Sequence, residues 1–194
     1  MPPKVKISKE QIIETAFELV RVNGEHALNA RAIACALNCS TQPVFSNFES
    51  MNDLHQAVIE KAYQIYLSFL QKEAESGKYP KYKAFGMAYI RFASEEKELF
   101  KLLFMRDRRG EGFTPTPDFI ASTQLIMQNN NVTKEVAELI HLEVWTCVHG
   151  IATMLATSFL ALNWELISNI LSDVYGGIKE KHLNGANKKW LLLK

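Results

Sequence analysis

The stretch NARAIACALNCSTQPVFSN, residues 29–47, decides how this chain folds. Its spacing predicts two short helices separated by a tight turn at Asn38-Cys39. The first helix is expected from about Ala30 to Leu37, because Asn29 is a favoured N-cap residue directly before it.

The second short helix is expected from Thr41 to Asn47, with Ser40 as its N-cap. Pro43 falls in the first turn of this helix, where a missing backbone N–H costs little. Since Pro43 cannot donate, we expect the Ser40 hydroxyl to accept a hydrogen bond from the N–H of Gln42.

Longer helices flank this pair on both sides. Before it, a capping box of Ser8 and Gln11 opens a helix that ends near Gly24. After it, a long helix begins at Ser50 or Asn52 and ends near Gly77. Apolar residues recur at helical spacing in both, at Ile12, Ile13, Ala16, Phe17 and Val20, and at Leu54, Val58, Ala62, Ile65 and Phe69. This is the anatomy of a helix-turn-helix module.

The rest of the chain also shows helical periodicity, without the strict alternation typical of strands. Further helices are expected at about 81–94, 96–106, 118–128, 133–159 and 163–182, with a loop over 107–117 and a polar turn over 129–131. We therefore predict an all-α fold of about nine helices. Residues 1–50 are expected to form a DNA-binding domain, and residues 51–194 an effector-binding and dimerisation domain.

Composition sets limits on the kind of protein. The chain has 194 residues, 47% of them hydrophobic, and a formal net charge of +1. Met1 to Lys9 is basic and Pro-rich without a following apolar segment, so no signal peptide is expected. The longest apolar stretch, Ile151 to Leu162, is shorter than a bilayer span. Three cysteines form no disulfide framework. These features predict a cytoplasmic protein without membrane contact.

The second short helix carries the residues expected to face the major groove. Gln42 can pair bidentately with adenine, and Thr41 can offer its methyl group to thymine. Lys4, Lys6 and Lys9 in the N-terminal arm can add ionic contacts. The full predicted DNA-binding set is Lys9, Asn29, Arg31, Thr41, Gln42, Val44, Phe45, Ser46 and Asn47.

These residues resemble the TetR/AcrR family of bacterial transcriptional repressors. The resemblance runs from about Ile12 to Ala62. It rests on Ile13, Ala16, Glu18-Leu19, Gly24, Asn29-Ala30-Arg31-Ala32-Ile33-Ala34, Ser40, Phe45-x-x-Phe48 and Asp53-Leu54. Farther on, Trp145-x-x-Val148-His149-Gly150 is similar to the Trp-His-Gly element of one subgroup of that family.

The resemblance implies a homodimer that binds a palindromic operator and releases it when a small molecule binds the C-terminal helices. Two departures weaken the expected grip on phosphates, because the family usually has Tyr at Phe45 and often Lys at Met51. Five acidic residues also cancel the five basic ones within residues 1–50. We therefore expect modest DNA affinity and a shallow salt dependence.

Aromatic and Met residues concentrate in the C-terminal helices, where they indicate either core packing or a pocket for an apolar or aromatic effector. The candidate effector residues are Tyr89, Phe92, Phe104, Met127, Trp145 and His149. His141 and His149 stand eight residues apart on one helix, a rise of about 12 Å, so they cannot share a metal ion. No cofactor is expected, and His149 is interpreted either as a packed, hydrogen-bonded side chain or as a ligand contact.

Three alternatives remain open at this stage. Cys35 and Cys39 could form a redox switch, although buried cysteines ordinarily act as small apolar residues. The chain could also be a helical ligand-binding dimer that has lost DNA affinity and acts through a protein partner. A helical enzyme is the third reading. The sequence shows no paired carboxylates, nucleophilic triad or phosphate-binding loop for it, so no enzyme is predicted.

Overall fold

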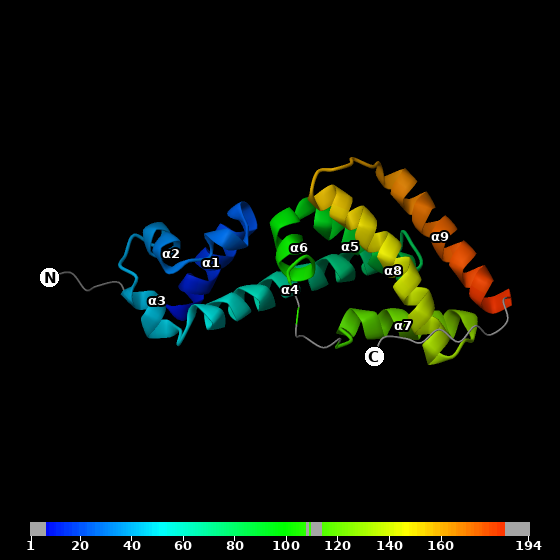
Figure 1. Ribbon diagram of the computed structural model, residues 1–194, viewed down its shortest axis with the longest axis horizontal. Coiled ribbons are helices and arrows are strands. Elements are labelled where there is room, and N and C mark those ends of the chain that lie inside the picture. Colours follow the sequence, from blue (N-terminus) through cyan, green and yellow to red (C-terminus); the bar gives the residue numbers. More distant parts are fainter. Residues whose placement is uncertain (1–6, 108, 110–113, 185–194) are drawn as a thin grey trace. The chain divides into compact units, whose positions relative to one another are not determined.

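The computed structural model describes residues 7–107, 109 and 114–184, and every regular element in them is helical. The elements are α1 Lys9–Asn23, η1 Glu25–Ala27, α2 Ala30–Ala36, α3 Gln42–Asn47, α4 Met51–Glu75, α5 Lys81–Glu95, α6 Lys97–Phe104, α7 Pro117–Asn130, α8 Lys134–Ala156 and α9 Trp164–Asn184 (Figure 1). This confirms the predicted all-α fold.

The chain divides into two compact units. The first combines residues 1–68 with residues 95–107, and the second combines residues 69–94 with residues 108–194. The core of the first unit collects apolar side chains from α1 to α4 at positions with almost no solvent exposure. They are Ile12, Ala16, Phe17, Val20, Ile33, Val44, Leu54, Val58 and Ala62.

The ends of α1 follow the sequence expectations. The Ser8 hydroxyl accepts from the Gln11 N–H, and the Gln11 side chain accepts from the Ser8 N–H, which confirms the capping box. Gly24 ends the helix with a φ of 87°. This positive φ is strained for any residue with a Cβ atom, so the backbone conformation favours glycine here. A Cβ atom at Gly24 would also lie 2.8 Å from Oε2 of Glu98 on α6, the mobile end of a side chain that would have to shift.

Helix α6 packs against α1 inside the first unit, a contact that the sequence did not predict. The Arg21 guanidinium donates to both carboxylate oxygens of Glu96, at 2.8 and 2.5 Å. These hydrogen bonds raise the pKa of Arg21 above its ordinary value. Fork-like pairing of this kind fixes geometry as well as charge, so it ties the end of α1 to the start of α6.

The buried face of α4 differs from the predicted stripe. Its buried apolar positions continue from Ala62 to Tyr66 and Leu70, whereas Ile65 and Phe69 are only half-buried. Residues four apart turn about 40° beyond a full rotation. The buried face therefore winds gradually around this long helix, and a straight stripe drawn through Ile65 and Phe69 misses it.

The second unit is built from the C-terminal end of α4 together with α5, α7, α8 and α9. Helix α8 packs against both α7 and α9, and α8 and α9 lie side by side in Figure 1. At Gly86 on α5, a Cβ would lie 3.3 Å from Leu171 of α9 and 3.4 Å from Val148 of α8. Glycine thus permits the close approach of three helices at this level.

Helix α7 begins at Pro117 and ends before Asn131, whose φ of 51° places it in the left-handed region. Two residues of the polar turn predicted over 129–131 therefore belong to α7, and Asn131 ends the helix. Of the predicted 107–117 loop, residues 108 and 110–113 lie outside the described residues.

Helix α8 is the one helix in the described ranges that is long and apolar enough to cross a membrane by length and composition. In its most apolar window, 39% of the residues are buried within the structure. A core helix of a soluble protein meets the same criteria, so this feature alone is weak evidence for a membrane span.

Candidate nucleic-acid interface

The turn between α2 and α3 is a hydrogen-bonded helix terminator. The Cys39 N–H donates to the Ala34 carbonyl at 2.9 Å, and the Asn38 N–H donates to the Cys35 carbonyl at 3.1 Å. Asn38 adopts a φ of 49°, as the residue in this position of a Schellman motif requires. This pair of bonds fixes the direction in which α3 leaves α2.

At the other end of α2, Asn29 is the N-cap residue, as predicted. Its side-chain oxygen accepts from the Ala32 N–H at 2.9 Å, and its amide nitrogen donates to the Ala27 carbonyl at 3.3 Å. Both the oxygen and the nitrogen of the Asn29 side chain therefore form hydrogen bonds that fix the start of α2.

The start of α3 differs from the expectation. The helix begins at Gln42, and its N-cap is Thr41, which has helical dihedral angles and makes no side-chain capping bond. The Thr41 carbonyl accepts from the N–H groups of Val44 and Phe45 at 3.1 and 3.4 Å. The predicted Ser40 cap is therefore wrong, because α3 starts one residue later than predicted and Thr41 takes the N-cap position.

Helix α3 presents Gln42, Phe45 and Ser46 to solvent, and Phe45 is 58% exposed. The Ser46 hydroxyl donates to the Gln42 carbonyl at 2.9 Å. The Asn47 amide donates to the Pro43 carbonyl at 2.8 Å. Among the described residues, none bonds to the Gln42 amide. The side chain of Gln42 is thus an exposed polar group on the outer face of α3.

Val44 is the exception among the predicted groove-facing residues. Its side chain is only 1% exposed and belongs to the core of the first unit. A helix of six residues has one buried side, and Val44 occupies it. The expectation that Val44 touches a base is therefore wrong.

Two exposed cations of the first unit lie on α1 and α2, the two helices that contact α3. Arg31 on α2 is exposed and forms no ion pair with any residue in the described ranges. The Lys9 ammonium lies 5.0 Å from the ring centroid of Phe48, the residue that ends α3. By contrast, Arg21 is engaged with Glu96 and Glu18. Lys4 and Lys6 lie outside the described residues.

In the second unit, three of the predicted effector residues form one cluster. The Tyr89 hydroxyl lies 2.8 Å from Nδ1 of His149, and the rings of Trp145 and His149 stack with centroids 4.8 Å apart. Burial lowers the pKa of His149. Trp145 remains 38% exposed. The cluster thus joins a polar pair to an aromatic surface that reaches solvent.

The other three predicted effector residues are placed elsewhere. Phe92 is fully buried and packs edge-on against Phe69 at 5.4 Å. Phe104 belongs to the first unit, where it contacts Tyr66 and Phe100. Met127 is half-buried on α7. The structure therefore supports the core-packing interpretation of Phe92.

A second Tyr–His pair was not predicted. The Tyr82 hydroxyl lies 3.1 Å from Nδ1 of His141, and the rings of Phe119 and Tyr175 pack around this pair. His141 is 9% exposed, and burial lowers its pKa to about 4. Burial also raises the pKa of the Tyr82 phenol. Both groups are therefore neutral at pH 7.

The two remaining site hypotheses concern metal and thiols. In the described ranges, no group of three or more His, Cys, Asp or Glu side chains could hold a metal ion. Cys35 is exposed, and the half-buried Cys39 thiol donates to the Ser40 carbonyl at 3.1 Å.

Comparisons with known proteins extend the description of the fold. No protein-family model matches the chain, and no curated protein matches it in sequence. The chain is similar to the solved structure of a TetR-like transcriptional regulator from Rhodococcus sp. RHA1. The TM-score is 0.57 and the sequence identity 16%, over 95% of this chain and 99% of that chain. At this identity the likeness shows a shared fold.

Proposed function

We propose that this chain is a DNA-binding transcriptional regulator, a repressor released from its operator by a small apolar or aromatic effector. The observation that carries the proposal is the exposed surface of α3, with Gln42 and Phe45, together with the exposed cations Arg31 and Lys9 on the two helices that contact α3. A short exposed helix braced by another helix is the element that enters the major groove. The fold shared with a TetR-like regulator supports the same function.

Residues 1–50 are the proposed DNA-binding module, and residues 51–194 are the proposed effector-binding and dimerisation part. A palindromic operator requires two copies of α3 about 34 Å apart, and a symmetric dimer would provide them. The proposed regulator is a cytoplasmic protein. Arg31 and Lys9 would contact phosphates, and Gln42 with Thr41 would contact base edges. Ser46 and Asn47 would act mainly by holding α3.

For the effector, we propose the cluster of Tyr89, Trp145 and His149. An apolar or aromatic ligand could stack on the exposed part of Trp145, while the Tyr89–His149 pair would supply polar contacts. The Trp145–His149 element also supports assignment to the Trp-His-Gly subgroup. By linkage, an effector that weakens operator binding must itself be bound less tightly by the operator complex.

A second candidate function is a helical ligand-binding dimer that acts through a protein partner without DNA. The acidic side chains of the first unit favour it, because Glu10, Glu14 and Glu18 are all exposed on α1. A salt-dependent shift on the DNA upstream of the chain's own gene would separate the two functions.

Gln42→Ala tests the direct reading of bases. We expect operator binding to weaken by about 1–3 kcal/mol while binding to random DNA stays nearly unchanged. Arg31→Ala is the matched control, since loss of a phosphate contact should weaken both and flatten the salt dependence. Fluorescence anisotropy over a series of salt concentrations measures the affinity of the native chain and both variants for operator and random DNA. Equal losses on both DNAs for Gln42→Ala would show that Gln42 reads no base.

Phe45→Tyr tests the placement of α3 against the backbone. The added hydroxyl should donate to a phosphate and contribute about 0.5–1.5 kcal/mol per half-site. The gain should be similar on operator and random DNA, because phosphate contacts carry no sequence information. The salt slope should stay constant, since no charge is added. Titrations that superimpose on those of the native chain would place Phe45 away from the phosphates.

A further inference from the structure

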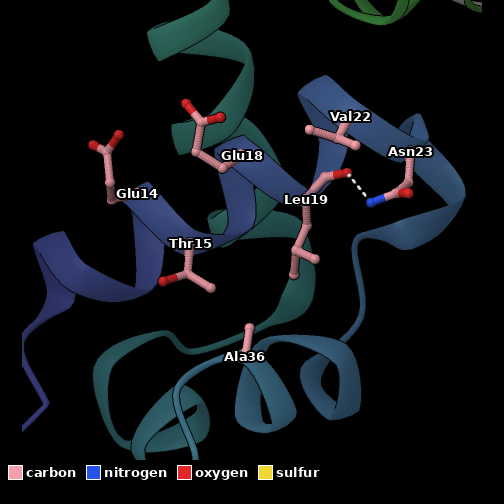
Figure 2. A pocket seen from close by; sticks show the side chains of 7 residues that line it. All are labelled: Glu14, Thr15, Glu18, Leu19, Val22, Asn23 and Ala36. Carbon is pink, nitrogen blue, oxygen red and sulfur yellow. Dashed lines mark hydrogen bonds between the residues drawn. The ribbon is translucent and has the colours of Figure 1, made fainter.

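A groove lies between α1 and α2 on the first unit, with a volume of about 370 Å³. Figure 2 shows Leu19 on α1 and Ala36 on α2 directed towards each other across it, with Val22 and Asn23 at one end. The Asn23 amide donates to the Leu19 carbonyl at 3.2 Å, so it is held at the wall. The groove is a preformed concavity between two helices.

The apolar part of the groove is open to solvent. Val22 is 71% exposed, Ala36 is exposed and Leu19 is half-buried. Exposed apolar side chains that gather in a concavity, with polar groups at the rim, are typical of an interaction site. Val22 therefore offers an anchor point to a second molecule at little cost in desolvation.

The rim of the groove is acidic. Glu14 and Glu18 line it, and Glu10 precedes them by one helical turn, so the three carboxylates form a stripe along α1. A backbone hydrogen bond lowers the pKa of Glu10. Glu14 pairs with Lys61, and Glu18 pairs with Arg21 at 3.4 Å. Both carboxylates are about half exposed or more, and surface ion pairs of this kind contribute little to stability.

The negative charge of this stripe indicates which kind of partner could bind. Phosphates would be repelled by Glu10, Glu14 and Glu18, so duplex DNA is a poor occupant. A segment that carries Lys or Arg beside aliphatic residues complements both the rim and the apolar floor. Helix-in-groove recognition uses this combination of apolar anchors and flanking charge.

We propose that the α1–α2 groove is a docking site for a basic, amphipathic segment of another protein. Aliphatic side chains of that segment pack on Leu19, Val22 and Ala36, and its basic side chains face Glu14 and Glu18. This role goes beyond DNA binding and effector binding. It also supplies a route by which the regulator contacts a protein partner while α3 is engaged elsewhere.

The test uses the full chain and a fluorescein-labelled helical peptide made only of leucine and lysine. Anisotropy titration measures its affinity for the native chain and for the Val22→Ser/Glu18→Gln double variant. The matched control is Ile120→Ser/Glu135→Gln, which removes an exposed apolar side chain and an exposed carboxylate from the second unit. The groove variant should bind about tenfold more weakly, and the control should bind like the native chain.

A photo-crosslinking leucine analogue in the peptide gives a second readout that does not depend on the variants. We expect crosslinks on α1 and α2. Equal affinity of both variants, or crosslinks spread over the chain, would overturn the proposal. So would displacement of the peptide by duplex DNA, or self-association of the native chain through this groove. The peptide titrations and the crosslinking are done without DNA, and duplex DNA enters only as a separate competitor, so their failure is distinct from failure of the proposed function.

Discussion

Between pH 7 and pH 4, the native chain is expected to lose about 3 kcal/mol more of its free energy of unfolding than a His141→Gln variant. His141 is buried beside Tyr82, and its pKa is lowered from 6.5 to about 4. The unfolded chain takes up a proton below pH 6.5, whereas the folded chain resists protonation down to about pH 4. The contribution of neutral His141 to the free energy of unfolding is therefore fully present above pH 6.5, and it is lost as the pH falls towards 4.

Urea unfolding at several pH values measures this difference. Trp145 and Trp164 belong to the second unit, so their fluorescence reports the unit that contains His141. His26→Gln is the control, because it makes the same substitution at an exposed histidine of the first unit, outside the unit that contains His141. A native profile parallel to that of His141→Gln would show that His141 is not protected from protonation.

Glutamate at both Leu166 and Ile170 should convert the proposed dimer into monomers. The two long helices leave apolar surface uncovered in the single chain, with Leu166 44% and Trp145 38% exposed. A symmetric interface through α8 and α9 would bury each introduced charge in both copies. An uncompensated buried charge costs several kcal/mol, so the dissociation constant should rise by about two to three orders of magnitude.

Sedimentation at micromolar concentration measures the mass against the 22.1 kDa of one chain. Ile120→Glu on α7 is the matched control, because Ile120 is 47% exposed in the same unit but lies outside α8 and α9. The control should remain dimeric. A native chain that sediments as a monomer would remove the basis for two copies of α3 on one operator.

Local patterns in the sequence predicted the helices well, because caps and apolar spacing act over a few residues. Ser8 with Gln11, Asn29 and the Asn38 turn all lie where the pattern placed them. The start of α3 was harder, since Ser40 and Thr41 are adjacent hydroxyl residues and either could cap it. Val44 was misplaced because six residues are too few for periodicity to define the buried side.

Contacts between distant residues could not be derived from spacing. Arg21 and Glu96 are 75 residues apart, and nothing local to either one indicates the other. The two Tyr–His pairs were easier to predict from the sequence. Tyr82 and Tyr89 are two turns apart on α5, and His141 and His149 are about two turns apart on α8, so matched spacing was a signal for two parallel contacts.

The first unit is discontinuous in the chain, since α6 joins it from beyond residues 69–94. During synthesis on the ribosome, α1 to α3 therefore emerge well before the segment that pairs with Arg21 and packs beside Gly24. A chimera that borrowed only residues 1–68 would keep α3 but leave that face of α1 without the helix that packs on it. Transfer of α1 to α3 into another protein of this fold consequently requires the α6 segment to be transferred with them, or the host's own α6 to supply a carboxylate at the position of Glu96.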